Sequence, residues 1–555
     1  MHNAMIVLDG ARIGAQNVTP LVIDALQALR DAGGGRLCFT PGEYHFYKDG
    51  VYSAFYAVSN NAAGEKPIVF PILQVDGLEI DGGGATFVFH DIVFPFVIDG
   101  CKRVTLKNMI LDRAQPPYAK MRVCSVSDRG FGLEIDRRES PFYVENGTLH
   151  FVREYGERSG LDRKYALHAT KRIRERYLFT GECADSTENL PVAYMWGDAE
   201  ERDWGVYLTY REGLGASPCL YEEGEELYVL LDADRTVDTI FLQNSEQIRI
   251  ENITVRQGLG MGIIGQLCRN VTVKGFCTDP VGRENGVTIC TDAMHFVNCD
   301  GRLEISECDI SYTGDDGLNV HGVYTLLQSV TEKGIEVSLM HQEQRGFCPY
   351  KAGDRLHLID RSILDTVAVF CVHACQVMGE RLDRILIEGA FEYGKEPAVS
   401  CESVLVENPD RMPHLHLHHN RFYHYPNLRL SGAGEMLVED NLLECAKGGI
   451  QINDLWDYWY ESGRVKHMVI RRNRLIGCNE LGAQQSFLQI GVSGFGATDA
   501  PKIHGRIEIT DNHFERLSRH AITACGVREL MLAGNRFDCE REDLILCDGK
   551  PIAAR

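Results

Sequence analysis

The stretch Leu415-His-Leu-His-His-Asn420 has a copy, Met436-Leu-Val-Glu-Asp-Asn441, that ends 21 residues later, and Ile507-Glu-Ile-Thr-Asp-Asn512 and Leu530-Met-Leu-Ala-Gly-Asn535 repeat the pattern. Alternating apolar and polar residues predict a half-buried β-strand. An Asn after such a strand tolerates a left-handed backbone and bonds to neighbouring backbone. A coil of about 22 residues cannot bury its own apolar face, but stacked coils can. The repeat therefore predicts a right-handed parallel β-helix with an asparagine ladder. A β-sandwich fits less well, because it has no reason for a fixed coil length.

Further features outside these copies complete an all-β fold. Residues 20–32 form an amphipathic pattern that glycines stop, which predicts a helical cap at the N-terminal end of the solenoid. Two stretches break the repeat and carry hairpin signals, such as Asn-Gly within Tyr143-Val-Glu-Asn-Gly-Thr-Leu-His150. We expect two small antiparallel, barrel-like β units there. The predicted division is residues 1–117 (cap and first coils), 118–240 (first insertion), 241–322 (central coils), 323–400 (second insertion) and 401–555 (last coils).

The charge of the chain narrows its partners. It carries 57 Lys and Arg against 79 Asp and Glu, a net charge of −22. Such a surface repels nucleic acid and anionic membranes, so neither is expected as a partner. No apolar run approaches the roughly 20 residues of a membrane-spanning helix. A neutral oligosaccharide or glycoconjugate is the easier ligand. A homo-oligomer is compatible with the flat faces of a solenoid, although no residue specifies one.

The cysteines and the N-terminal residues bear on location. The 19 cysteines are scattered, odd in number and without Cys-x-x-Cys pairs. This is typical of reduced thiols in a cytosol and gives no zinc-binding pattern. The first residues lack the basic and apolar regions of a signal peptide. We therefore expect a cytoplasmic protein.

The densest polar cluster spans two successive coils. Asp292 and the pair Asp315-Asp316 are 23 residues apart, about one coil, and stacked coils lie roughly 4.8 Å apart. Three carboxylates should therefore meet on one face. Close carboxylates repel, so one is held protonated as an acid while another stays ionised as a base. Glycoside hydrolysis needs this pairing. An isolated Asp-Asp-Gly would more often be a solvated turn, but Asp292 one coil earlier and His321 following favour a catalytic site.

Two further groups are candidates for binding a sugar. The first accompanies the aspartates and comprises His295, Asn319 and His321. The second is the segment 454–463, which holds two of the four tryptophans, and its candidates are Asp454, Trp456, Trp459 and Glu461. Aromatic faces stack on sugar rings, and carboxylates bond hydroxyl groups. An aromatic cap over the core explains the second group almost as well.

One histidine-rich strand resembles a metal site without having its partners. His414, His416 and His418 would share one face of a strand, with Leu415 and Leu417 on the other. No partner in the sequence supports metal binding, and a polar outer strand is the simpler interpretation. We predict no metal and no other cofactor.

These motifs together resemble glycoside hydrolase family 110, the α-1,3-galactosidase family. The resemblance rests on Ile80-Asp-Gly-Gly-Gly84, Thr291-Asp-Ala-Met-His-Phe-Val297, Asp315-Asp-Gly-Leu-Asn-Val-His-Gly322, Gly346-Phe347 with Ala352-Gly-Asp354, and Trp459-Tyr-Glu-Ser-Gly463. It implies a β-helix with inserted barrel-like units, exo-acting removal of terminal α-1,3-linked galactose by inversion, and no metal. It also implies that Asp292, Asp315 and Asp316 are catalytic. By analogy with pectin hydrolases, which the family resembles, Asp315 would be the acid and Asp292 with Asp316 the base side. A different substrate pose would exchange these roles.

Two other functions are compatible with the same fold. A pectin-type hydrolase or lyase would need Ca²⁺ or basic side chains near Asp315 to hold a uronate carboxylate. A non-catalytic carbohydrate-binding solenoid would tolerate loss of all three aspartates. The linkage, the aglycone and the acceptance of a fucose branch depend on loop shape and stay open.

Overall fold

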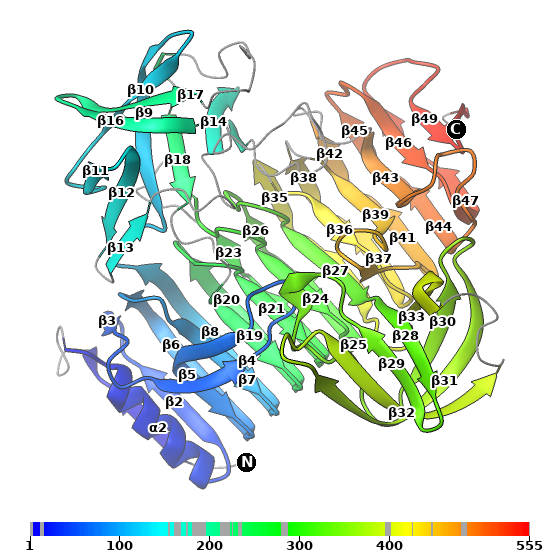
Figure 1. Ribbon diagram of the computed structural model, residues 1–555, viewed down its shortest axis with the longest axis horizontal. Coiled ribbons are helices and arrows are strands. Elements are labelled where there is room, and N and C mark those ends of the chain that lie inside the picture. The colour runs from blue at the N-terminus through cyan, green and yellow to red at the C-terminus, as the bar shows by residue number, and fades with distance from the viewer. Residues whose placement is uncertain are drawn as a thin grey trace.

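A parallel β-helix, interrupted by two inserted units, extends from the first described coils to the last (Figure 1). The computed structural model describes residues 4–10, 16–153, 156–159, 168–173, 176–179, 196–210, 223–224, 226–230, 236–278, 287–393, 401–424, 426–445, 448–478 and 486–553. Coil stacks on coil through parallel strand pairs, for example Leu415 beside Met436 and Met436 beside Met468. The predicted fold class is thereby confirmed. No helix in the described ranges is long and apolar enough to cross a membrane.

Two large sheets form the walls of the solenoid. The first has 20 strands: β1 Met5–Leu8, β2 Gly35–Phe39, β3 Glu43–Phe46, β6 Asp76–Phe89, β8 Lys102–Arg113, β20 Glu246–Val255, β22 Arg269–Lys274, β23 Cys277–Thr278, β25 Asp300–Ser306, β26 Asp309–Ile310, β34 His414–His418, β35 Arg421–His424, β37 Glu435–Glu439, β38 Leu442–Cys445, β41 His467–Arg471, β42 Arg474–Ile476, β44 His504–Thr510, β45 His513–Glu515, β47 Val527–Ala533 and β48 Arg536–Phe537. The second has 14 strands: β4 Tyr52–Tyr56, β5 Gly64–Leu73, β7 Phe94–Asp99, β19 Ile240–Gln243, β21 Ile263–Gln266, β24 Met294–Val297, β27 Leu318–Val323, β36 Leu428–Leu430, β39 Ile450–Asp454, β40 Glu461–Ser462, β43 Ser486–Val492, β46 His520–Ala524, β49 Ile545–Cys547 and β50 Lys550–Pro551. One apolar core extends between the two sheets from the first coils to the last.

The asparagine ladder forms as predicted. The Nδ2 of Asn420 donates to the Oδ1 of Asn441 at 3.0 Å, Asn441 donates to Asn473 at 2.9 Å, and Asn473 donates to Asn512 at 3.0 Å. The left-handed backbone is one residue away from where we expected it in these coils. His419 and Asp440, which precede the asparagines, have φ of 56°. In the early coils, at Asn108 and Asn252, the asparagine itself is left-handed.

The cap is helix α2, Thr19–Asp31, which begins with Pro20 in its first turn and ends before Gly33 and Gly34, both with positive φ. It buries Val22, Ala25, Leu26 and Leu29 against the first coils. The exposed face of the helix carries Leu21, which is 42% exposed.

Two antiparallel units interrupt the solenoid and project on opposite sides of it in the view of Figure 1. The first comprises β9 Tyr118–Val126, β10 Gly130–Ile135, β11 Phe142–Glu145, β12 Thr148–Arg153, β13 Gly156–Ser159, β14 His168–Ile173, β15 Arg176–Phe179, β16 Trp196–Arg202, β17 Gly205–Tyr210 and β18 Glu226–Leu230. Its predicted hairpin forms, with Tyr143 opposite His150. The second is a closed six-stranded barrel of β28 Thr325–Thr331, β29 Gly334–Ser338, β30 Arg355–Asp360, β31 Asp365–Met378, β32 Arg384–Tyr393 and β33 Val404–Glu407. Each unit has its own apolar core.

Candidate active site

The three aspartates meet where two coils stack. Asp292 precedes β24, and Asp315 with Asp316 precedes β27, the next strand of the same sheet. The two turns are joined through backbone bonds from Ala293 N to Asp316 O (2.9 Å) and from Asp315 N to Thr291 O (3.2 Å). One carboxylate oxygen from each aspartate lies within 4.8 Å of the other two. Asp292 and Asp316 are buried, and Asp315 is the partly exposed member. The structure therefore brings together the cluster that the coil spacing predicted.

The glycines beside the aspartate pair are required by the packing of one coil on the next. A Cβ on Gly314 would lie 2.1 Å from the backbone oxygen of Cys290, one coil earlier. A Cβ on Gly317 would lie 2.8 Å from the ring of Phe422, on the coil that follows. Both distances are shorter than real Cβ contacts, so these positions require glycine for coil-to-coil packing.

Arg429 is a member of this site that the sequence did not reveal. It lies in β36, one coil after the aspartate pair, in register with Asn319. Its Nε is 3.0 Å from the Oδ2 of Asp316. Burial alone would lower the pKa of Arg429, but the carboxylates of Asp316, Glu461, Asp315 and Asp292 raise it above its usual value. A guanidinium therefore offsets part of the charge of the aspartates.

A chain of two buried histidines leads away from Asp292. His295 Nδ1 lies 2.6 Å from the Oδ2 of Asp292, and His295 Nε2 lies 2.7 Å from His321 Nε2. His321 Nδ1 is 2.6 Å from the backbone oxygen of Gly322. A carbonyl oxygen only accepts, so His321 Nδ1 donates.

Counting hydrogens places an additional proton in this chain. The three short contacts need three hydrogens, whereas two neutral imidazoles carry two N–H groups. Burial lowers the pKa of His321 to about 4, so the additional proton does not reside there. His295 Nε2 then donates to His321, and the remaining proton is shared between His295 Nδ1 and Asp292. Asp292 is thus partly neutralised, which reduces repulsion among the three carboxylates.

Glu461 contacts both this pair of histidines and a residue from a distant loop. Its Oε1 is 3.5 Å from His321 Nε2 and accepts a hydrogen bond from Asn60 Nδ2 at 3.0 Å. Burial alone would raise the pKa of Glu461, but His321, His295, Arg429 and the bond from Asn60 lower it below its usual value. Asn60 comes from the loop between β4 and β5, 401 residues away in sequence, and no local signal could have found it.

The predicted sugar-binding residues fall into two groups. His295 and Asn319 are adjacent in register on β24 and β27, and both are buried, as is His321. Trp459 stands beside the barrel, where its ring centroid is 4.4 Å from that of His341. Trp456 packs with barrel residues, donates from Nε1 to Ser493 O at 2.7 Å, and lies under Arg361. These contacts account for Trp456 as a packing residue, and its role in sugar binding stays a prediction.

Asp454 is fully buried, so the structure gives it no surface through which to reach a sugar hydroxyl. Its Oδ1 accepts from Gly463 N at 3.0 Å and its Oδ2 accepts from Tyr324 at 3.2 Å. Burial, followed by the charge of Glu407, raises the pKa of this carboxyl to about 7 from an ordinary value of 3.8. We therefore assign Asp454 to holding the segment that carries Glu461.

The raised pKa of Asp454 predicts how stability changes with pH. The folded state favours the protonated acid, so this contribution to stability is full below pH 3.8 and is lost as pH rises through about 7. Asp454→Asn keeps the shape without the charge. From pH 5 to pH 8, the Tm of the wild type should fall relative to this variant by about 2–5 °C, measured by calorimetry. A constant difference would contradict the assignment. Asp457→Asn, at an exposed neighbour, is the control.

Two sets of side chains here are compact enough to hold a metal ion. They are the three aspartates, and His295 with His321 and Glu461, and the donor atoms of each set lie within 4.8 Å of one another. The hydrogen that His295 Nε2 donates to His321 satisfies the two facing imidazoles, so the chemistry of this site can be derived from the chain's own residues.

Comparisons with known proteins identify relatives of this chain. No family model matches the chain. Alpha-1,3-galactosidase A of Shewanella woodyi is 26% identical over 523 residues, covering 93% of this chain and 83% of that protein. Alpha-1,3-galactosidase B of Bacteroides thetaiotaomicron is 25% identical over 526 residues, covering 94% and 83%. Alpha-1,3-galactosidase B of Phocaeicola vulgatus is 24% identical over 559 residues, covering 94% and 87%.

Solved structures are more distant. The A-module of a mannuronan C-5 epimerase from Azotobacter vinelandii has a TM-score of 0.37 and 8% identity, covering 96% of this chain and 95% of that chain. A family 28 exopolygalacturonase from Yersinia enterocolitica has a TM-score of 0.37 and 10% identity, covering 99% and 79%. Scores this low carry no argument about function. The resemblance to glycoside hydrolase family 110 rests instead on the sequence matches, which make this chain a relative of the α-1,3-galactosidases along almost its whole length.

Proposed function

We propose that this protein is an exo-acting glycoside hydrolase that removes terminal α-1,3-linked galactose from an oligosaccharide or glycoconjugate with inversion at the anomeric carbon. One observation carries the proposal: Asp292, Asp315 and Asp316 present carboxylate oxygens within 4.8 Å of one another, in a chain that aligns with α-1,3-galactosidases over 93% of its length. Acid and base carboxyl groups are what hydrolysis of a glycosidic bond needs.

The contacts of each aspartate suggest its role. Asp315 is the partly exposed member of the cluster, so it is assigned to protonating the leaving oxygen. Asp316 is buried and held by the Arg429 guanidinium, which stabilises its carboxylate form and suits it to accept a proton from water. Asp292 shares its proton with His295 and is assigned to orienting that water beside Asp316. No metal or other cofactor enters these steps.

Inversion at the anomeric carbon is proposed from the family resemblance. Acid and base are about 6.5–9.5 Å apart in most inverting glycosidases, whereas these carboxylates are closer. In this site the water is assigned to a position between Asp292 and Asp316. The distance between the acid Asp315 and the base Asp316 therefore does not need to accommodate it. The stereochemistry therefore needs a direct measurement.

A linkage panel tests the substrate. The purified protein is incubated with galactose disaccharides linked α-1,3, α-1,4 and α-1,6, and released galactose is measured. The expected result is release from the α-1,3 compound at a rate at least tenfold above the others, since one misplaced leaving group costs about 1.4 kcal/mol or more. Absence of release from all three would overturn the proposal.

A pectin-type activity is the alternative function, and adding polygalacturonate to the same panel tests it. That activity needs a basic group free to bind a uronate carboxylate. In the described part of the site, Arg429 lies among four carboxylates of the protein. Its charge is already offset, which disfavours an anionic sugar.

We also propose that the protein works in a reducing compartment such as the cytoplasm. The 17 cysteines that the structure describes are all free thiols, and burial raises the pKa of Cys101 to about 11 and of Cys308 to about 12. Cell fractionation with an antibody would test the location.

A further inference from the structure

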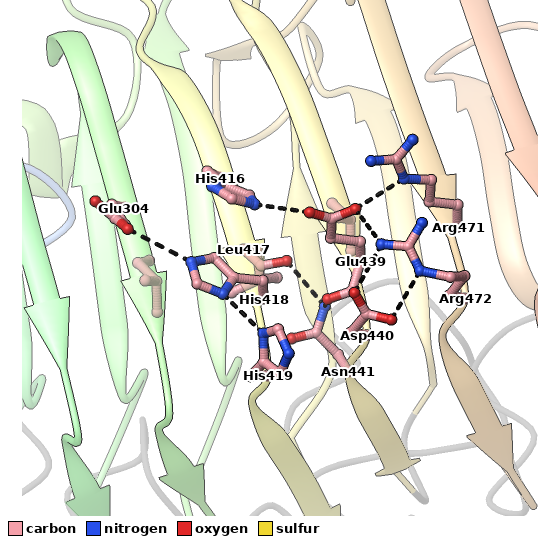
Figure 2. A network of polar contacts seen from close by, with 12 residues as sticks. Glu304, His416, Leu417, His418, His419, Glu439, Asp440, Asn441, Arg471 and Arg472 are labelled. Carbon is pink, nitrogen blue, oxygen red and sulfur yellow. Dashed lines mark hydrogen bonds and ion pairs between the residues drawn. The ribbon is translucent and has the colours of Figure 1, made fainter.

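In the folded structure a carboxylate lies beside the histidine-rich strand β34. Figure 2 shows the outer face of the 20-stranded sheet, where β34 pairs with β25. Glu304 is directly beside His416 in this register, and His418 is two residues further along β34. All three side chains are half-buried on the outer face, while Leu415 and Leu417 are buried on the other. The sequence predicted the shared face of the histidines but could not supply Glu304, which lies 112 residues before His416.

The distances within this cluster fit ligands around one ion. The rings of His416 and His418 have centroids 4.0 Å apart, and the Oε1 of Glu304 is 3.5 Å from His418 Nε2. One donor atom from each of the three residues lies within 4.8 Å of the other two. A separation of 3.5 Å is long for a hydrogen bond between a carboxylate and an imidazole. Zinc ligands bound at about 2.0–2.2 Å sit at comparable separations from one another.

His416 is held by a carboxylate on its other side. Its Nε2 is 3.0 Å from the Oε1 of Glu439. Glu439 also accepts hydrogen bonds from Arg471 at 2.7 Å and from Arg472 at 2.6 Å. It therefore accepts the N–H of His416 and leaves Nδ1 with a lone pair. A carboxylate that orients a histidine in this way is a common feature around bound metals.

His418 has a neighbour at each of its ring nitrogens. Its Nδ1 lies 2.9 Å from His419 Nδ1, and its Nε2 faces Glu304. A metal ion between His418 and Glu304 would bind the lone pair of Nε2 on a neutral imidazole.

We propose that Glu304, His416 and His418 form a binding site for a divalent transition-metal ion, best suited to Zn²⁺. Two imidazoles and one carboxylate are a donor set that zinc accepts, with water completing its four ligands. The strand β25 comes before the barrel insertion and β34 follows it. An ion here would tie together the two coils between which the barrel leaves and returns. The site is on a different sheet from the aspartates, so it is structural and independent of the galactosidase chemistry.

Zinc binding to untagged protein tests this site. Isothermal titration with Zn²⁺ is run on the wild type, on the double variant His416→Ala/His418→Ala, on Glu304→Gln, and on the control His414→Ala. His414 is on the same strand and face but outside the cluster. The double variant should bind one equivalent of zinc fewer than the wild type. Glu304→Gln should bind at this site at least tenfold more weakly, and His414→Ala should bind as the wild type does.

The comparison between variants isolates the new site. Any zinc held by the aspartates or the buried histidines is common to all four proteins and cancels. Circular dichroism and galactosidase activity, which should be unchanged in every variant, establish that each protein is folded. Equal zinc stoichiometry in the wild type and the double variant would overturn the proposal, as would an equal loss in His414→Ala.

Discussion

Asp315→Asn should lower kcat on galactose-α-1,3-galactose by about 10²–10⁴-fold, the usual contribution of a general acid. Asn has nearly the same shape but cannot protonate the leaving oxygen. Asp315 is partly exposed and its turn is held by backbone bonds from Asp315 N and Gly314 N, so the fold should be kept. Initial rates and a thermal melt measure the two effects.

The leaving group distinguishes an acid from a merely structural residue. An aryl α-galactoside whose phenol is already acidic needs little protonation, so Asp315→Asn should lose much less activity on it than on the disaccharide. An equal loss on both substrates would contradict the assignment of Asp315 as the acid. Asp309→Asn, at a partly exposed aspartate on the other sheet, is the matched control and should keep full activity.

Arg429→Met should have the second large effect. The variant removes the guanidinium that lies 3.0 Å from buried Asp316 and leaves this carboxylate among its neighbouring carboxylates. Arg429 is half-buried and Asp316 is buried, so loss of this charged contact should cost about 1.5–3 kcal/mol of stability, and loss of a preorganised charge at a reacting centre costs about 10²–10³-fold in kcat. The free energy of unfolding, measured by chemical denaturation, and the initial rate should therefore both fall.

Arg429→Lys keeps the positive charge but loses the planar guanidinium. It should recover most of the free energy of unfolding and part of kcat. If Arg429→Met instead had the stability and kcat of the wild type, the electrostatic account of the aspartate cluster would be wrong.

Local repetition explains what the sequence could predict. Alternating strands that end in Asn recur along the chain, so the pattern predicts an asparagine ladder even though the asparagines from Asn420 to Asn512 are 21, 32 and 39 residues apart. Asp292 and Asp315 are one coil apart with no insertion between them, so their stacking followed from the same count.

Insertions explain what the sequence could not predict. Arg429 is in the coil directly after the aspartate pair, but the barrel separates them in sequence and hides the period. Glu304 and His416 are also neighbours on adjacent strands, and the barrel likewise separates them in sequence. Asn60 reaches Glu461 through a loop whose path no periodicity encodes. Asp454 was predicted to touch sugar because it is a carboxylate beside tryptophans, yet its neighbours Tyr324 and Gly463 bury it.

The anomeric form of the first product tests the central claim most directly. Proton NMR follows galactose-α-1,3-galactose from the moment wild-type protein is added, with Asp315→Asn beside it. Our account predicts that β-galactose appears first and mutarotates later, and that the variant releases almost none in the same time. Release of α-galactose first would contradict inversion, and equal release by the variant would contradict the role of the aspartate cluster.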